Sequence, residues 1–235
     1  MTSDAPEQGA LLLTGASGTV GTALLRALAP VWPGELVALG RTCPWPRAAP
    51  TRRFVPADLG DPAAVARVGR RLAKGPPIGA LVCAAGMDAR ASLHGIDIQA
   101  AATCAQVNCW AHLQLLDAAT QTRRQPGASA GPLPTVLVSS DVIGDAQPAT
   151  LIYAAAKAAA EEAFRHAAAD TAPPGIAVLI LRLPDIGVPM RAATPGPPPP
   201  PRTGRPPHLA LAAAAATTAA FVTSAHLPTV EVWHA

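Results

Sequence analysis

Three features of the sequence predict an α/β fold in which helices cover both faces of a doubly wound, mainly parallel, seven-stranded sheet. Short apolar runs alternate with longer helix-like stretches along the whole chain. These runs, such as ALLLT at 10–14 and IAVLILR at 176–182, are continuous, as expected for strands that are buried on both faces. A glycine-rich turn follows the first run. Because no internal repeat and no second core are evident, we expect one domain that spans residues 1–235.

The elements are expected in strict alternation. Strands are predicted near 10–14, 35–39, 52–56, 79–84, 133–139, 176–182 and 228–233, and helices near 19–30, 61–73, 97–123, 150–170 and 208–224. The uncharged, Ala-rich run from Leu209 to Ala225 is expected to be a buried helix, since its 17 residues are too few to span a bilayer.

The segment 184–208 interrupts this alternation. It has no periodicity and includes eight Pro between Pro195 and Pro207, which exclude a helix. Two interpretations are open at this point: a solvated linker without a function, or a substrate loop that forms a flap over a ligand site.

Composition excludes several classes of protein. With 18 Lys+Arg against 15 Asp+Glu, 14% charged and 50% hydrophobic residues, the chain is neither disordered nor a polyanion-binding tail. Its arginine pairs are dispersed without interleaved aromatics, so no nucleic-acid partner is expected. The four Cys and six His show no metal-ligand spacing, so we expect no metal site. The polar, acidic start MTSDAPEQGA is unlike a signal peptide, so we expect a cytoplasmic protein with no membrane partner.

A phosphate-binding turn is predicted between the first strand and the first helix. In TGASGTVG, Gly15 allows a tight turn, Gly18 lets the backbone approach a pyrophosphate, and Gly21 lets the helix pack close to the sheet. The helix N-terminus then faces the phosphates. This context predicts a Rossmann-type NAD(P)-binding domain whose cofactor contacts include Thr14, Gly15, Ser17, Gly18, Thr19, Val20 and Gly21.

The end of the second strand indicates which cofactor is preferred. Where an NAD enzyme would carry an acidic residue, this chain has Arg41, and a guanidinium can bind the extra phosphate of NADP. NADP(H) is therefore expected, with NAD(H) less favoured; the alternative is that Arg41 is one solvated cation among several. Asp58-Leu59 closes the third strand, where Asp58 could bind the adenine amino group, while Asp61 is the better helix N-cap.

An acid/base pair is predicted on the helix expected at 150–170. Tyr153 is the only tyrosine, and Lys157 lies one turn later on the same face. An ammonium beside a phenol is expected to lower the phenol pKa, which makes Tyr153 a plausible proton donor. Ser140 ends the fifth strand thirteen residues earlier.

Together these motifs resemble the short-chain dehydrogenase/reductase family over nearly the whole chain: TGASGTVG, Asp58-Leu59, CAAG at 83–86, Asn108 in VNCW, Ser140 in SSD, and Tyr153 and Lys157 in YAAAK. The resemblance implies that Ser140 holds the substrate carbonyl oxygen, Tyr153 moves its proton, Lys157 binds the nicotinamide ribose, and Asn108 places a proton-relaying water. It also implies cofactor contacts at Ala84, Ala85, Gly86, Pro184 and Ile186, and a homodimer or homotetramer.

The chain departs from the compact members of the family in three places. Two residues rather than three separate Gly15 from Gly18, Cys83-Ala84-Ala85-Gly86 replaces Asn-Asn-Ala-Gly, and Pro184-Asp185 replaces a Pro-Gly. The first of these, with RLPDIGVP at 182–189, looks more like the extended branch, yet too few residues follow for its substrate domain. An atypical, single-domain member is expected.

The expected function is that of an NADP-dependent oxidoreductase that interconverts a carbonyl and an alcohol on a small organic substrate. A non-redox reaction (epimerisation, dehydration or cyclisation) and an NADP(H)-binding sensor or docking module without catalysis are the alternatives. Cys83, Cys104 and Cys109 are interpreted as small buried hydrophobes. Glu161 and Glu162 are expected on a solvated face or an interface, and no role is assigned to His112 or His166.

Overall fold

A single seven-stranded sheet forms the centre of the molecule. The computed structural model describes residues 9–47, 49–124, 131–144, 149–170, 175–186 and 206–234. The strand order is β3-β2-β1-β4-β5-β6-β7, and every neighbouring pair is parallel. The order reverses between β1 and β4, which is the topological switch point where such sheets bind ligands. The predicted doubly wound α/β fold is therefore confirmed.

Most elements begin and end within two residues of their expected positions. The strands are β1 (Ala10–Thr14), β2 (Leu36–Gly40), β3 (Arg52–Pro56), β4 (Ile78–Cys83), β5 (Leu133–Ser140), β6 (Ile176–Leu183) and β7 (Val230–His234). The helical elements are α1 (Thr19–Leu28), α2 (Pro62–Ala73), α3 (Ile98–Ala105), η1 (Gln106–Trp110), α4 (Ala111–Thr122), α5 (Leu151–Asp170) and α6 (Pro207–Thr223).

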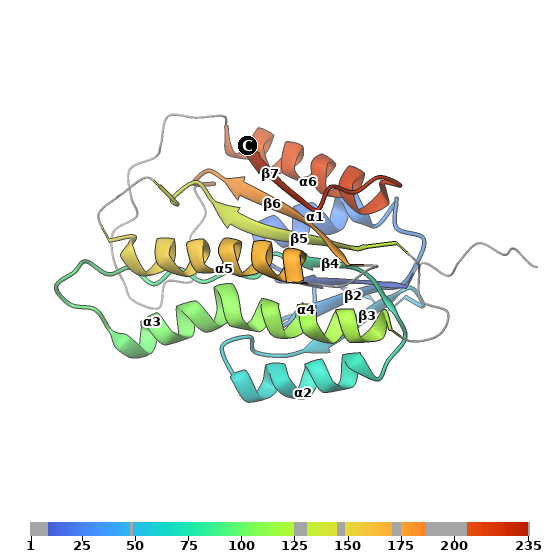
Figure 1. The fold of residues 1–235 in the computed structure, drawn as a ribbon, viewed down its shortest axis with the longest axis horizontal. Coiled ribbons are helices and arrows are strands. Elements are labelled where there is room, and N and C mark those ends of the chain that lie inside the picture. Colours follow the sequence, from blue (N-terminus) through green and yellow to red (C-terminus); the bar gives the residue numbers. More distant parts are fainter. Residues whose placement is uncertain are drawn as a thin grey trace, which may run out of the picture.

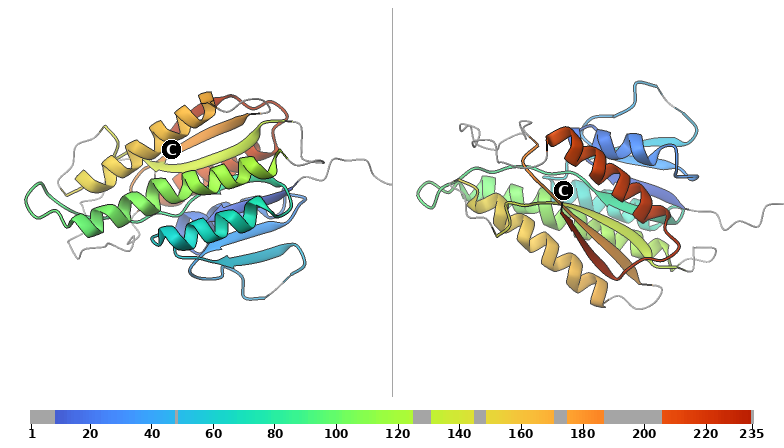
Figure 2. Two further views of the ribbon diagram at one scale, coloured as in Figure 1. Left: turned by 60° about the horizontal axis from the view of Figure 1, so that its bottom comes forward. Right: turned by 90° about the horizontal axis from the view of Figure 1, so that it is seen from above.

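Helices cover the sheet from both sides, as Figure 1 shows. The helices α2, α4 and α5 pack on one face, where Val65, Leu115 and Phe164 belong to one apolar cluster with side chains of the strands. The helices α1 and α6 lie side by side on the other face, where Leu24 and Phe221 belong to a second cluster (Figure 2). The strands between β3 and β7 are therefore buried on both faces, which explains their mostly continuous apolar sequences, whereas the edge strands β3 and β7 are more polar and more exposed.

The helix expected at 97–123 is interrupted. Asp97 caps its start, because Oδ1 accepts hydrogen bonds from the backbone N–H groups of Gln99 and Ala100. The five residues of η1 then form a π-helical turn between α3 and α4, with Asn108 at its centre. Such turns widen a helix locally and are common at functional sites.

The helix α6 is half-buried rather than buried. Ala210, Ala214 and Phe221 face the sheet, whereas Leu209 is 49% exposed. The sequence could not predict this, because an uncharged run of Ala and Thr has no polar face to mark the solvent side. In the part of the chain that the structure describes, no helix combines the length and apolarity needed to cross a bilayer. The predicted substrate loop at 184–208 lies mostly outside the described residues, which resume at 206.

Candidate active site

The glycine-rich turn after β1 has the geometry that its sequence predicts. Gly15 has φ of +66°, and a Cβ there would lie 2.6 Å from the Cα of Ala85. A Cβ on Gly21 would lie 2.8 Å from the Cα of Ala16, so no side chain fits. Gly18 is the N-cap of α1 and makes no side-chain cap bond. The first N–H groups of α1 are thus left for another acceptor, which is the arrangement of an anion site.

Thr14 joins this turn to the neighbouring strand. Its Oγ1 accepts hydrogen bonds from the backbone N–H groups of Ala84 (3.0 Å) and Ala85 (3.1 Å), just beyond the end of β4. Thr14 itself is fully buried, whereas Ser17, Gly18 and Thr19 are exposed at the mouth of the turn. Thr14 therefore fixes the position of the turn.

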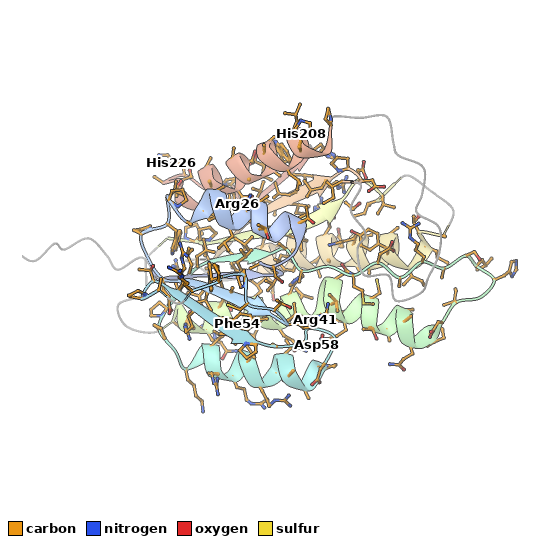
Figure 3. All side chains as sticks on the ribbon, turned by 180° about the vertical axis from the view of Figure 1, so that it is seen from behind. Arg26, Arg41, Phe54, Asp58, His208 and His226 are labelled. Atoms are coloured by element: carbon orange, nitrogen blue, oxygen red, sulfur yellow. The ribbon has the colours of Figure 1, made fainter. Side chains whose placement is uncertain are left out.

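Arg41 and Asp58 lie at the same edge of the sheet, since Gly40 at the end of β2 pairs with Pro56 at the end of β3 (Figure 3). Both side chains are exposed. One oxygen of Asp58 accepts a hydrogen bond from the backbone N–H of Gly60 (2.9 Å). Leu59 is 5% exposed and belongs to the core, so its side chain stabilises this corner from inside.

The side chains of Ser140, Tyr153 and Lys157 come together where β5 ends and α5 begins. A side-chain hydrogen bond links Ser140 to Tyr153. The Nζ atom of Lys157 lies 5.7 Å from the centroid of the Tyr153 ring and donates a hydrogen bond to the carbonyl of Val138 on β5 (2.8 Å). The strand and the helix thus hold all three groups in one cluster.

The pKa of Tyr153 is raised above its ordinary value, whereas the sequence predicted that Lys157 would lower it. Burial raises the pKa of the phenol above its ordinary value, and the negative charge of Asp88 raises it further, while the hydrogen bond with Ser140 lowers it only in part. The expectation was wrong because it counted the neighbouring charge but not the loss of solvent. Burial also lowers the pKa of Lys157 to about 8, which leaves the ammonium mostly charged at neutral pH.

Asn108 in η1 is held rigidly against the loop after β4. Its Nδ2 donates hydrogen bonds to the carbonyls of Met87 (2.7 Å) and Cys104 (2.9 Å). A Cβ on Gly86 would lie 3.3 Å from Oδ1 of Asn108 and 3.7 Å from Nζ of Lys157. The absence of a side chain at Gly86 therefore keeps the space beside Asn108 and Lys157 open.

The remaining sequence-predicted contacts follow β6. Ser140 pairs with Leu183, and the N–H of Asp141 donates to the carbonyl of Leu183 (3.0 Å). Pro184 and Ile186 come directly after and are half-buried. The structure thus brings this segment to the same end of the sheet as Ser140. Among the described residues, no group of three or more His, Cys, Asp or Glu side chains is placed to hold a metal ion.

Comparison with known proteins identifies the family. Residues 10–196 match the family model described as short chain dehydrogenase. The chain belongs to this family. The comparison with curated protein sequences found no match.

Solved structures of the family share the fold of this short-chain dehydrogenase. One from Burkholderia cenocepacia, in complex with NADP, is 22% identical with a TM-score of 0.72 and covers 97% of this chain and 89% of its own. An alcohol dehydrogenase from Thermococcus sibiricus, complexed with 5-hydroxy-NADP, is 18% identical with a TM-score of 0.70 and covers 96% and 95%. A third, from Streptomyces avermitilis, is 20% identical with a TM-score of 0.71 and covers 95% and 88%.

Sequence analysis missed two residues of this short-chain dehydrogenase that lie at the site. Asp88 follows Gly86 by two positions, and its neighbours Met87 and Ala89 pack in a small cluster with Tyr153. Its Oδ2 pairs with Nε of Arg90 (3.0 Å), whereas the buried Oδ1 has no hydrogen-bond partner. No motif marks Asp88. His112 is the other residue, and its position one turn after Asn108 could have revealed it.

The expected environment of Glu161 was also wrong. The sequence predicts a solvated or interfacial carboxylate, but Glu161 is buried and accepts hydrogen bonds from Ser139 (2.7 Å) and Arg182 (2.8 and 2.6 Å). Glu162 beside it is exposed, with 65% of its side chain accessible. Neighbouring positions on a helix diverge, so one of the pair faces the sheet. Arg182, distant in sequence, makes burial of this charge possible.

Proposed function

We propose that this short-chain dehydrogenase is an NADP(H)-dependent oxidoreductase that interconverts a carbonyl and an alcohol on a small organic molecule. The observation that carries the proposal is the cluster of Ser140, Tyr153 and Lys157 at the carboxyl end of β5. The cluster lies at the switch-point end of the sheet, where the glycine-rich turn follows β1.

The site fits a dinucleotide in three respects. The backbone at Gly15, Gly18 and Gly86 leaves a cradle that side chains would fill or crowd. The start of α1 offers unpaired N–H groups to a pyrophosphate. The exposed Arg41 at the end of β2 suits a ribose phosphate, which supports NADP(H) over NAD(H). The related structures from Burkholderia and Thermococcus, which were solved with NADP and 5-hydroxy-NADP, are consistent with this choice.

The bound cofactor supplies or accepts the hydride, and the residues of the chain handle the proton. Ser140 would hold the carbonyl oxygen of the substrate, and the Tyr153 hydroxyl would donate its proton to the same oxygen as the alcohol forms. The phenol of Tyr153 is protonated at neutral pH, and although burial raises its pKa, the hydrogen bond with Ser140 acts in the opposite direction and would stabilise the phenolate that remains after proton transfer. Lys157 keeps a positive charge beside it, and the fixed amide of Asn108 maintains the neighbouring loop.

The first experiment is a calorimetric titration of the purified protein with NADPH and NADH, followed by assays of NADPH oxidation with a panel of ketones and aldehydes. We expect NADPH to bind more tightly and at least one carbonyl to be reduced. Tyr153→Phe should retain NADPH binding and lose turnover, whereas His166→Phe, an exposed change on the same helix, should match the wild type. Unchanged turnover by Tyr153→Phe contradicts the proposed proton donor.

The titration and the activity assays together separate the alternative functions. Substrate turnover without net oxidation of NADPH would indicate a non-redox reaction. NADPH binding with no activity toward any carbonyl or alcohol would indicate a sensor or docking module. Binding of neither cofactor would contradict every function in this class.

We further infer that the enzyme is a homodimer or homotetramer in the cytoplasm, with α4 and α5 at the subunit contact. The small side chains along α5 would allow another helix to approach closely, and Trp110 at the end of η1 is 52% exposed. Light scattering after size-exclusion chromatography tests the oligomer; a monomer at micromolar concentration contradicts it.

A further inference from the structure

His112 on α4 is a buried histidine that makes direct contact with Thr14, the residue that leads into the glycine-rich turn. It has no exposed surface, and its Nε2 lies 3.1 Å from Oγ1 of Thr14. The same Oγ1 accepts hydrogen bonds from the backbone N–H groups of Ala84 and Ala85. The imidazole therefore lies behind the joint between the turn after β1 and the loop after β4.

The hydrogen bonds around Thr14 decide which way the bond to His112 runs. A hydroxyl oxygen has two acceptor lone pairs and one proton. The N–H groups of Ala84 and Ala85 use both lone pairs, so the hydroxyl proton remains for His112. Nε2 must therefore accept, which requires a neutral ring with its proton on Nδ1. A ring protonated on Nε2 would bring a third donor to an oxygen that has no lone pair left.

The surroundings of the ring favour the same neutral state. Burial and the positive charge of Lys157 lower the pKa of His112 to about 3, while the backbone carbonyl of Asn108 acts in the opposite direction. Nδ1 is buried and makes no hydrogen bond of normal geometry. His112 is thus uncharged over the whole pH range in which an enzyme would work, and its Nε2 is a permanent acceptor.

We propose that His112 is a positioning residue for the cofactor: as a neutral acceptor it orients the Thr14 hydroxyl, so that the lone pairs of Thr14 hold the loop after β4 against the glycine-rich turn. The proposal rests on the proposed cofactor site. It links that site to Asn108, because His112 and Asn108 occupy successive turns of one helix. A hydroxyl without this acceptor could rotate and release one of the two N–H groups.

The proton assignment can be tested without any cofactor. Long-range ¹H–¹⁵N correlation spectra of the histidine rings distinguish protonated from unprotonated ring nitrogens. The signal that disappears in His112→Gln identifies His112 among the six histidines. We expect an unprotonated Nε2 and a protonated Nδ1 from pH 6 to pH 8. The opposite tautomer, or a charged ring, overturns the proposal whether or not any variant binds NADPH.

Cofactor binding tests the consequence. His112→Phe keeps a ring but removes the acceptor, and we expect about tenfold weaker NADPH binding, as for the loss of one buried hydrogen bond. The KM for NADPH should rise while kcat at saturating NADPH changes little. His112→Gln, which retains an acceptor oxygen, should recover most of the affinity. Thr14→Val should weaken binding similarly, and the double variant should be no weaker than Thr14→Val alone.

A matched control separates positioning from general destabilisation. Thr122 is a buried threonine at the far end of α4, and its Oγ1 accepts a hydrogen bond from the N–H of Ile78 at the start of β4 (2.9 Å). Thr122→Val should lower Tm but leave the Kd for NADPH unchanged. Additive effects of the His112 and Thr14 variants, or an unchanged Kd in His112→Phe, overturn the proposal. A wild type that binds no NADPH instead contradicts the proposed function, and the tautomer still tests His112.

Discussion

Replacing Glu161 by Gln removes a buried charge without changing the shape of the side chain. In the native protein, Oε1 accepts hydrogen bonds from Ser139 and from Nε of Arg182, and Oε2 accepts a second bond from Arg182. The side chain of Glu161 is only 3% exposed. Ser139 precedes Ser140 on β5, and Lys157 lies one turn before Glu161 on α5. The substitution therefore disturbs the support of the site without touching its reacting groups.

The cost follows from the partners that remain. A hydrogen bond to a charged group contributes about 1.5–3 kcal/mol, and Glu161→Gln turns a paired charge into a neutral amide facing a guanidinium. The Arg182 side chain is 22% exposed and can regain water. We therefore expect the loss of stability to be smaller than the summed contributions of the three hydrogen bonds. A loss of about 2–3 kcal/mol in unfolding free energy at pH 7 corresponds to a Tm lower by about 4–12 °C for a chain of this size.

The direction of the pKa shift of Glu161 predicts how the stability difference changes with pH. Burial acts to raise the pKa of Glu161, but the hydrogen bonds from Arg182 and Ser139 outweigh it and hold the pKa below its ordinary value. Since an unfolded Glu titrates near ~4.3, the charge stabilises the fold above that pH, and this contribution is lost as pH falls through the lower, folded pKa. Urea unfolding from pH 7 downward should show the wild type and Glu161→Gln converging below about pH 4.

Glu162→Gln is the matched control for this experiment. Glu162 is the adjacent carboxylate, exposed to solvent and paired with Arg165 and His166. Exposed pairs contribute about 0–1 kcal/mol, so little change is expected. The reasoning is refuted if the two variants lose equal stability at pH 7, or if the loss in Glu161→Gln stays constant on acidification.

Three further changes test the site itself. Asp88→Asn removes a negative charge that raises the pKa of Tyr153, so the absorbance titration of this sole tyrosine should shift to lower pH; an unchanged or higher midpoint contradicts the proximity of the two groups. Arg41→Ala should weaken NADPH binding about tenfold or more and leave NADH nearly unaffected, given the strength of charged hydrogen bonds; equal losses by calorimetry argue against a phosphate contact. Gly15→Ala should cost at least about 1–2 kcal/mol, because φ of +66° is unfavourable for L-residues, and should abolish NADPH binding; Gly131→Ala, with no atom near its Cβ, is the control in denaturant unfolding.

The fold could be predicted because its signals are local. Continuous apolar runs of five to eight residues, such as β4 and β6, indicate strands buried on both faces, and Asp61 capping α2 at 2.8 Å is a short-range preference. The π-helical turn at Asn108 could not be predicted, because no local signal in the sequence marks it and the bond from Asn108 to Met87 joins two separate segments. The exposed side of α6 was missed since its sequence has no polar face.

The sequence by itself determined the α/β class of the fold, the glycine-rich turn, and the proximity of Tyr153 to Lys157, because spacing along a turn or a helix suffices to place neighbours. Only the tertiary structure decided the chemistry of these groups. Burial raises the pKa of Tyr153, Arg182 turns Glu161 into a buried ion-pair partner, and Thr14 makes His112 a neutral acceptor. Solvent exclusion and hydrogen-bond direction depend on residues that are far apart in the chain, so they follow from packing alone.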